Sequence, residues 1–442
     1  MRNYYLIILA LIFVLKMSCA PQKYTRDIDV TEYNIEVHFE NPGKVDFMVD
    51  VISKINPKLD HIEFLLTPGA EIDSVSVEHN GIWKKLSYST IKDTIRISIP
   101  PEISIGTEHP MRFVYSTPVR DTIGDFLYLD RGFRYYPLII DDVAKVKIAA
   151  TVPAGYKMFS GGDLVDIKTK KSLVTYKYAT KIPVFKIPIV LIRPDNYSLL
   201  TKQCNGKGAE FYFLKQKNNS NLDIVEEICK TLQYYESNIG EFHHNNLTFI
   251  EIDQYPRSSF IGTGLVLSGT QVVANYKKEK YQGLYLLIAA QWFGAGVFGD
   301  FQSKGFWFFT LSLPHYLRLM YTSESYGEQE FKRELQTPYD KYLNYSDSDH
   351  DMPTMEIDMP NKPVKIYNIK GRGPMILNQL RIEMGDENWH EFVQSLYKKM
   401  QGKVMIYEMF KEHLAKFADE KIVGEFDRMV NSRGDINQSQ NE

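Results

Sequence analysis

The sequence reads Leu286-Leu287-Ile288-Ala289-Ala290-Gln291-Trp292-Phe293-Gly294 within a long apolar region. Only Gln291 is polar in this stretch, and the pattern predicts a buried helix. From residue 281 to residue 314 there is no His and no Glu, and the only charges are Asp300 and Lys304. These residues therefore cannot supply, in any register, the paired histidines and the glutamate that a zinc-binding helix needs.

The end of this stretch nevertheless resembles a zinc-binding helix, the H-E-x-x-H-x-W-F-G helix of the gluzincin aminopeptidases (peptidase family M1). In that helix two His at i and i+4 bind zinc, and the Glu polarises the attacking water. Aligned on Gln-Trp-Phe-Gly, the two His positions are Leu286 and Ala290, and the Glu position is Leu287. The third ligand, a Glu nineteen residues beyond the second His, falls at Phe309. All four are hydrocarbon, so the resemblance implies this fold without zinc or another cofactor.

Two segments upstream also resemble the family. Residues 257–267 resemble the G-A-M-E-N-x-G-L strand, whose Glu binds the free amino terminus of the substrate. The Gly-Leu-Val-Leu ending is present, but the Glu position is Ile261. Residues 232–252 resemble the segment that leads into the family's catalytic domain. The resemblance therefore implies that recognition of a free amino terminus is lost.

A fourth segment lies downstream. Residues 372–381 resemble the Y-x-K-G-A-x-x-L-x-x-L-R helix, whose tyrosine stabilises the tetrahedral intermediate. The tyrosine position is Lys370, and Tyr367 lies one turn earlier. In total the resemblance covers residues 33–429. Because ligands, general base, amino-terminus anchor and tyrosine are all replaced, the sequence is identified as a pseudoenzyme of this family, and we expect no enzymatic activity.

Other residues that could bind metal have weaker patterns. His243 and His244 are adjacent, so their side chains point apart in extended structure, and we expect structural roles for both. His315 has no His or acidic partner at i−4 or i+4, which predicts a lone imidazole on a helix surface. Residues 347–351 have spaced carboxylates but lack the Gly and terminal Glu of a calcium loop. A solvated acidic loop is the favoured interpretation.

The start of the chain predicts export and lipid attachment. The apolar run of residues 4–15 follows Arg2 and is too short to span a bilayer, as in a signal peptide. The motif Lys16-Met17-Ser18-Cys19 resembles a bacterial lipobox, although Lys16 departs from the usual Leu or Val. We predict a signal peptide at 1–19, lipidation of Cys19 and a tether at 20–30; ordinary secretion is the alternative. Because no acidic cluster follows Cys19, we expect an outer-membrane lipoprotein that faces the periplasm.

Composition limits the class of protein further. Apart from Cys19 the chain has only Cys204 and Cys229, which could form one disulfide in an oxidising compartment, although the sequence leaves their pairing open. The formal net charge is −3, without basic runs, so nucleic acid is not an expected partner. Hydrophobic residues make up 44% of the chain, which is enough for two or three packed domains.

The overall pattern predicts an α+β multidomain fold. Residues 31–203 have short alternating apolar and polar runs separated by turn signals such as Asn80-Gly81, which predicts an amino-terminal β-sandwich. Residues 204–430 change to a mixture of strands and long apolar helices, and resemble a thermolysin-like, mostly helical catalytic-type module. The polar residues 431–442 are expected to be a disordered tail.

Two functions remain once catalysis is set aside. The first is a scaffold or accessory subunit of an outer-membrane protein complex, with outer-membrane or other envelope proteins as partners and a lipid anchor in the membrane. The second is a periplasmic lipoprotein that binds peptides or chain segments in the cleft left by the peptidase fold. The 29 tyrosines suit either function, because aromatic anchors dominate binding hot spots.

Overall fold

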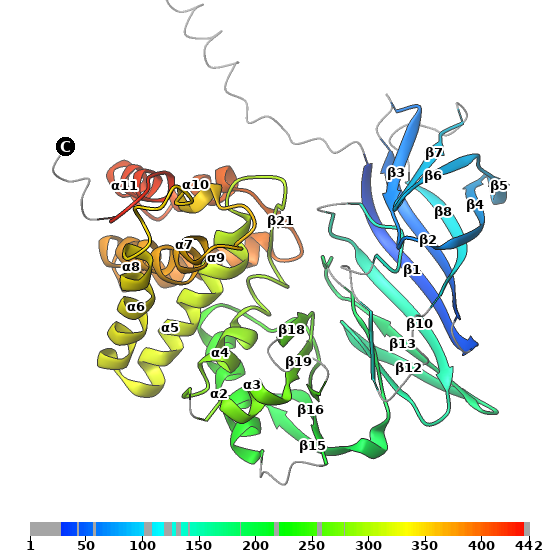
Figure 1. Cartoon of the computed structure of the whole chain (residues 1–442), viewed down its shortest axis with the longest axis horizontal. Coiled ribbons are helices and arrows are strands. Elements are labelled where there is room, and N and C mark those ends of the chain that lie inside the picture. Colours follow the sequence, from blue (N-terminus) through cyan, green and yellow to red (C-terminus); the bar gives the residue numbers. More distant parts are fainter. Residues whose placement is uncertain are drawn as a thin grey trace, which may run out of the picture.

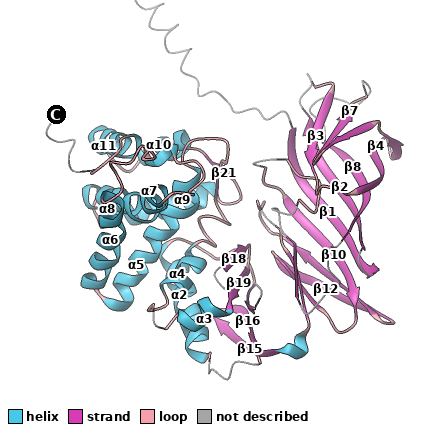
Figure 2. Ribbon diagram, viewed as in Figure 1, coloured by secondary structure: helices cyan, strands magenta, loops and turns pink. Residues whose placement is uncertain are grey.

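The computed structural model describes residues 28–41, 44–55, 59–100, 108–118, 126–129, 134–139, 142–185, 187–215, 221–253, 259–277 and 279–436. Cys19 lies outside these residues. The chain forms a strand-rich module followed by a mainly helical one, side by side (Figures 1 and 2). This is the fold class that the sequence predicted. Among the described residues no helix is both long and apolar enough to cross a membrane.

The first module is built on an eight-stranded sheet in which every neighbouring pair is antiparallel except β1 and β10. Its first strand begins within the segment that was expected to be a tether, which is therefore shorter than predicted. In sheet order the strands are β12 (Asp163–Lys170), β13 (Leu173–Ala179), β10 (Lys145–Pro153), β1 (Ile28–Asn41), β2 (Lys44–Ile55), β8 (Glu108–Pro118), β4 (Glu71–His79) and β5 (Ile82–Lys85).

Two three-stranded sheets cover the inner face of the large sheet. Alternate residues of β2, such as Val45, Phe47 and Val49, point into the shared core, as the period of two predicts. The small sheets contribute Phe64, Ile95 and other apolar side chains to the same core, which makes the module a sandwich. Their strands are β3 (His61–Leu65), β7 (Thr94–Ser98) and β6 (Tyr88–Ile91), and β11 (Lys157–Ser160), β14 (Ile189–Ile192) and β9 (Phe126–Leu129).

The second module begins with a five-stranded sheet of β15 (Tyr197–Cys204), β16 (Lys207–Leu214), β17 (Asn246–Ile252), β19 (Leu265–Gly269) and β18 (Ser259–Gly262). The sequence placed β15 in the sandwich, which was predicted to end at residue 203. Its hydrogen bonds instead run to β16, so the sheets divide at the short 3-10 turn η2 (Pro194–Asn196). Cys204 of β15 is disulfide-bonded to Cys229 of α2 (Leu222–Asn238), which answers the pairing question that the sequence left open.

Helices form the rest of the second module. Two π-helical segments, η3 and η5, precede α5 and α8. The short strands β20 (Phe298–Gly299) and β21 (Val404–Met405) pair between the helices. In chain order the helical elements are α3 (Thr270–Asn275), α4 (Gln282–Ala289), η3 (Phe308–Ser312), α5 (Leu313–Tyr326), α6 (Glu328–Leu343), η4 (Thr354–Glu356), α7 (Pro363–Tyr367), η5 (Asn368–Arg372), α8 (Gly373–Met384), α9 (Asp386–Met400), α10 (Tyr407–Leu414) and α11 (Glu420–Asn431).

The residues that follow α11 are ordered by specific contacts, contrary to the predicted disordered tail. Ile436 is buried, and its N–H donates to the Tyr339 hydroxyl (3.0 Å). The carbonyl oxygen of Gly434 accepts from Nε of the fully buried Arg372 (2.9 Å). Disorder was predicted from the polar composition of these residues. In the structure, residues distant in sequence form hydrogen bonds with their backbone groups. Residues 437–442 lie outside the described residues.

A separate apolar cluster joins the modules. Phe159 of β11 and Val190 of β14 pack with Tyr212 and Leu267 of the five-stranded sheet. The Gly162 N–H also donates to the Thr263 carbonyl across the junction (2.9 Å). The small sheet of β11, β14 and β9 is therefore covered by the sandwich core on one face and by the second module on the other.

Candidate functional site

The positions that correspond to the family's two zinc-binding His are Leu286 in α4 and Ala290, the C-cap residue of α4. The Ala290 N–H donates to the Leu286 carbonyl (2.9 Å), so the two residues are one helical turn apart, as the alignment requires. Leu287 is 7% exposed and Ala290 is 5% exposed, whereas Leu286 is half-buried. The frame of a two-His helix is therefore present with hydrocarbon side chains in its chemical positions.

The residues after α4 bring two of the family-like segments together. The buried Gln291 side chain accepts from the Gly264 N–H (2.9 Å) and donates to the Gly262 carbonyl (3.2 Å). These two hydrogen bonds attach α4 to the turn between β18 and β19. The Trp292 indole N–H donates to the Gly240 carbonyl after α2 (2.8 Å). The polar residue that interrupts the apolar stretch is thus a structural bridge, a role that its position in the sequence did not reveal.

The position of the third zinc ligand lies in an aromatic core. Phe309 belongs to η3 and is 1% exposed. Its ring centre is 5.4 Å from that of Phe308 and 5.4 Å from that of Phe410 in α10. Gly305 has a positive φ of 89°, and a Cβ built there would lie 2.8 Å from the Phe309 ring. The close approach of this loop to the ring therefore requires glycine.

Lys370, the position that corresponds to the family's tyrosine, lies next to a residue that contacts η3. The Ser312 hydroxyl of η3 donates to the Ile369 carbonyl of η5 (2.8 Å), and Lys370 is the next residue. Lys370 is exposed to solvent. Tyr367 stacks on Tyr345, with ring centres 6.0 Å apart.

The amino-terminus anchor position is only partly visible. Ile261 lies in β18, and its backbone pairs with Val266 of β19 in the antiparallel register. Its side chain lies outside the described residues. The backbone register nevertheless places this strand at the edge of the five-stranded sheet, beside the turn that Gln291 holds.

The histidines that the sequence considered have different surroundings. The Nε2 atom of His243 is 2.6 Å from the Tyr397 hydroxyl. His244 is buried at the junction of the modules, and its Nδ1 atom is 4.0 Å from Asp163 Oδ1. Burial lowers the pKa of His244 to about 4, so the imidazole is neutral at physiological pH. Both contacts suit the structural roles that were expected.

The predicted solvent exposure of two other candidate metal-binding segments needs correction. His315 is half-buried rather than a surface imidazole, and burial together with the nearby Arg318 and Lys370 lowers its pKa well below the ordinary value. Asp351 is buried rather than solvated, and its Oδ2 accepts from the Tyr342 hydroxyl (3.0 Å). The preceding residues 347–350 remain at the surface. For Asp351 the cause is a contact distant in sequence, because the Gly434 N–H donates to the same carboxylate oxygen (3.3 Å).

The residues at the former zinc site do not fit a zinc ion. Zinc in proteins is bound by nitrogen, sulfur or oxygen atoms, whereas the side chains at the four positions have only carbon and hydrogen. Among the described residues there is no group of three or more His, Cys, Asp or Glu placed to hold a metal ion. We use "former zinc site" below only as a label for the four positions that correspond to the family's zinc ligands and general base, which are Leu286, Leu287, Ala290 and Phe309.

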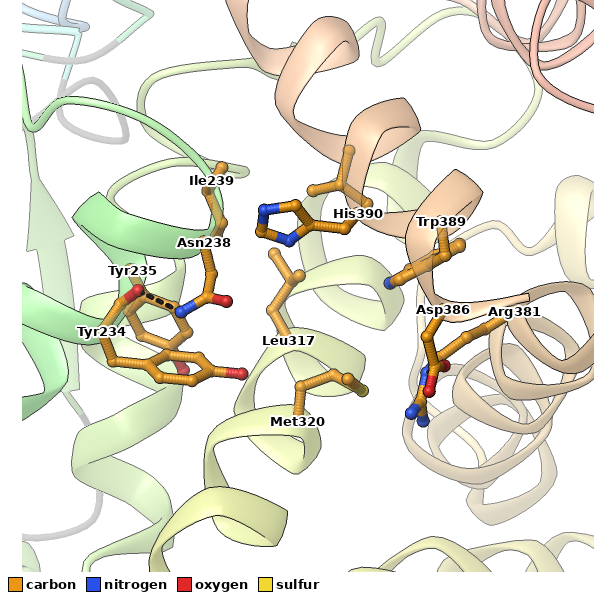
Figure 3. A pocket seen from close by; sticks show the side chains of 11 residues that line it. Tyr234, Tyr235, Asn238, Ile239, Leu317, Met320, Arg381, Asp386, Trp389 and His390 are labelled. Carbon is orange, nitrogen blue, oxygen red and sulfur yellow. Dashed lines mark hydrogen bonds and ion pairs between the residues drawn. The ribbon is translucent and has the colours of Figure 1, made fainter. Parts of the chain in front are cut away.

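The structure also has a pocket that the sequence did not predict, with a volume of ≈ 220 Å³. We call it the α2–α9 pocket, because α2 and α9 form its opposite sides (Figure 3). Its residues come from four helices and the residue after α2, so no local motif marks it. The lining residues are Tyr234, Tyr235, Asn238, Ile239, Leu317, Met320, Arg381, Asp386, Trp389, His390 and Val393.

The fold of the two modules is shared with proteins of known structure. The two modules have the arrangement seen in M1 zinc metallopeptidases. An M1 zinc metallopeptidase from Deinococcus radiodurans superposes with a TM-score of 0.74 at 15% identity, over 92% of this chain and 94% of that one. A mutant of that enzyme bound to a Tyr-Ser-Ala substrate gives a TM-score of 0.73 at 16% identity, over 92% of this chain and 95% of the other.

A second solved structure agrees. Native yeast LTA4 hydrolase superposes with a TM-score of 0.73 at 13% identity, over 95% of this chain and 72% of that one. No protein-family profile and no curated protein matches the sequence. The similarity therefore establishes the M1 peptidase fold, which the sequence motifs had predicted from residues 33–429.

Proposed function

We propose that this protein is a catalytically inactive relative of the M1 peptidases that acts as a scaffold or accessory subunit of an outer-membrane protein complex. One observation carries the proposal: the fold and the helix frame of the peptidase are retained, while the former zinc site consists of hydrocarbon side chains. Leu287 and Phe309 are buried in the same apolar core. Burial of each such side chain contributes about 1.5–3 kcal/mol, an upper estimate, so packing stabilises a region that metal ligands would otherwise occupy.

The membrane part of the proposal rests on the start of the chain and on the disulfide. Cys19 follows a short apolar run and a small residue, as a lipidated cysteine does. The Cys204–Cys229 disulfide supports an oxidising compartment such as the periplasm. Residues 20–27 separate Cys19 from β1, and eight extended residues span at most about 28 Å. A lipid at Cys19 would thus keep the sandwich close to the membrane surface.

The surface part of the proposal rests on β12, an edge strand of the large sheet. Its side chains Leu164, Val165 and Ile167 are exposed. Edge strands of soluble proteins are usually protected from pairing, and exposed apolar residues there mark sites of association. We infer that a partner envelope protein contacts this edge.

Purification from native membranes tests this proposal. We expect the wild-type protein, solubilised in mild detergent, to co-purify with a stoichiometric partner. Lysine at Val165 and Ile167 should abolish this association without unfolding the protein. Ile382→Lys is a matched control. Ile382 is 64% exposed, which is close to the 66% of Val165, but it lies on α8 and not on β12. A monomer after gentle solubilisation, with no reproducible partner after crosslinking in cells, would refute the scaffold role.

A second candidate is the capture of peptides or extended chain segments in the cleft of the peptidase fold. The structure of the Deinococcus radiodurans mutant with a bound tripeptide favours it, because the fold is shared. The replacement of the anchor Glu by Ile261 predicts that a free amino terminus would not be required. A monomeric protein that retains peptides from a defined library, equally with free and acetylated amino termini, would favour this candidate over the scaffold.

A further inference from the structure

The α2–α9 pocket has polar groups around an apolar floor. Figure 3 shows Tyr234 and Asn238 of α2 on one side, Leu317 and Met320 of α5 in the middle, and the side chains of α9 on the other. Ligand sites commonly combine apolar walls with a few convergent polar groups. The residues of the former zinc site are not among those that line this pocket.

Several of the side chains that line the pocket can donate hydrogen bonds. The Trp389 side chain is buried, and Figure 3 shows its indole nitrogen directed toward the pocket. Burial raises the pKa of Tyr234 to about 12, so its hydroxyl keeps a proton that it can donate. His390 also lines the pocket and offers an imidazole. A ligand that only accepts hydrogen bonds would satisfy these groups.

Arg381 places a positive charge on the side of the pocket where Trp389 lies. Its Nε donates to Asp386 Oδ1 (2.6 Å), and the Tyr316 hydroxyl is a further neighbour of the guanidinium. A guanidinium has five N–H donors, so these two contacts leave donors for another group. The Asp386 carboxylate is largely exposed, so solvent screens its charge more than that of the half-buried Arg381. The free N–H groups of the guanidinium could therefore donate to an anion while Asp386 stays paired.

The volume limits the size of the anion. Ligand pockets commonly have volumes of about 300–1,000 Å³, so a pocket of ≈ 220 Å³ is small for a ligand site. This space suits one hydrophobic amino acid rather than a nucleotide or a sugar chain. The floor of Leu317 and Met320, with Ile239 and Val393 beside it, would contact an apolar arm.

We propose that the α2–α9 pocket binds a small carboxylate with one apolar arm, of the size of a single hydrophobic amino acid. The carboxylate would contact Arg381 and the Trp389 N–H, and the arm would lie on Leu317 and Met320. The ligand is either a free acid or the carboxy-terminal residue of a peptide, since both present the same chemistry. This site is independent of the scaffold role proposed above.

Calorimetric titration of the full mature protein with N-acetyl-L-leucine tests the proposal. Its uncharged amide, N-acetyl-L-leucinamide, has the same shape and is the matched ligand control. Because hydrogen bonds to charged groups are roughly twice as strong as neutral ones, we expect the acid to bind about tenfold or more tightly than the amide. Equal affinities, or no saturable binding of the acid at millimolar concentrations, would overturn the proposal.

Three variants place the binding in this pocket. Arg381→Gln should weaken binding of the acid about tenfold or more and bring it to the level of the amide. Met320→Trp should abolish binding by filling the floor. Arg333→Gln, an exposed arginine of α6 that also pairs with acidic neighbours, should leave the affinity unchanged. Unchanged affinity in both pocket variants, with thermal unfolding confirming that they fold, would also overturn the proposal.

A peptide that ends in leucine separates the two sources of the carboxylate. If acetyl-Gly-Gly-Gly-Leu with a free carboxy terminus binds at least as tightly as N-acetyl-L-leucine, and its amidated form does not, the pocket accepts a chain end. If only the single residue binds, the pocket takes a free acid. Either result supports the carboxylate site.

Discussion

Removal of the Phe309 ring is the sharpest test of the idea that the former zinc site is now core. Phe309 is 1% exposed, and its ring lies between Phe308 and Phe410 at centroid distances of 5.4 Å each. Replacement of a buried Phe by Ala typically costs about 3–5 kcal/mol, because apolar contacts are lost and a cavity remains. We expect Phe309→Ala to lower the free energy of unfolding of the second module within this range.

The neighbouring Phe301 supplies a matched control. It is 51% exposed and lies in the turn that precedes η3. We expect Phe301→Ala to cost less than about 1 kcal/mol, since a half-exposed ring loses fewer contacts on truncation. Chemical denaturation followed by circular dichroism, with the disulfide intact in all samples, measures both variants. Equal midpoints for Phe309→Ala and wild type would show that this position is not core, and the packing argument would fail.

Three further predictions concern the site, the junction and the anchor. Restoring the family's zinc-binding residues should lower the melting temperature without producing aminopeptidase activity, because four polar groups would enter an apolar region; a stable, active, zinc-containing variant would contradict this. His244 has a folded pKa of about 4 against about 6.5 when unfolded, so only the unfolded state gains a proton between these values. Stability should therefore be complete above pH 6.5 and fall by up to about 3 kcal/mol as the pH drops towards 4, and His244→Gln should flatten this dependence in denaturation series at several pH values. Mass spectrometry of the amino-terminal peptide should find lipid on Cys19, whereas a soluble wild-type protein that begins elsewhere would remove the membrane anchor. The restored zinc-site variant carries Leu286→His, Leu287→Glu, Ala290→His and Phe309→Glu.

Local pattern was enough to predict the fold class. Alternation in β2 identifies the buried face of the sandwich because side chains in a strand point to opposite sides in turn. The apolar character of Leu287 and Phe309 identifies them as candidates for burial, and both are in the core. The order of the family-like segments predicted the M1 fold, and the structure joins these segments through contacts of Gln291 and Trp292.

Long-range contacts decided what the pattern could not. β15 alternates like the sandwich strands before it, but its hydrogen bonds run to β16, and a single strand's pattern does not name its partner. Residues 432–436 read as a polar tail, yet Arg372 and Tyr342 satisfy their backbone groups. The pairing of Cys204 with Cys229 depends on how α2 lies against the sheet, which spacing alone leaves open.

By itself, the sequence determined the chemistry of the former zinc site: side chains without nitrogen, oxygen or sulfur cannot bind zinc in any fold. It also determined which faces of the strands and helices are apolar, since these follow from periodicity. Only the tertiary structure decided that Leu286 stays half-buried while Leu287 is in the core. It alone brought Tyr234, Arg381 and Trp389 together around the α2–α9 pocket. The physical reason is that a cavity is a property of the space between helices, and that space depends on how they pack rather than on any one helix.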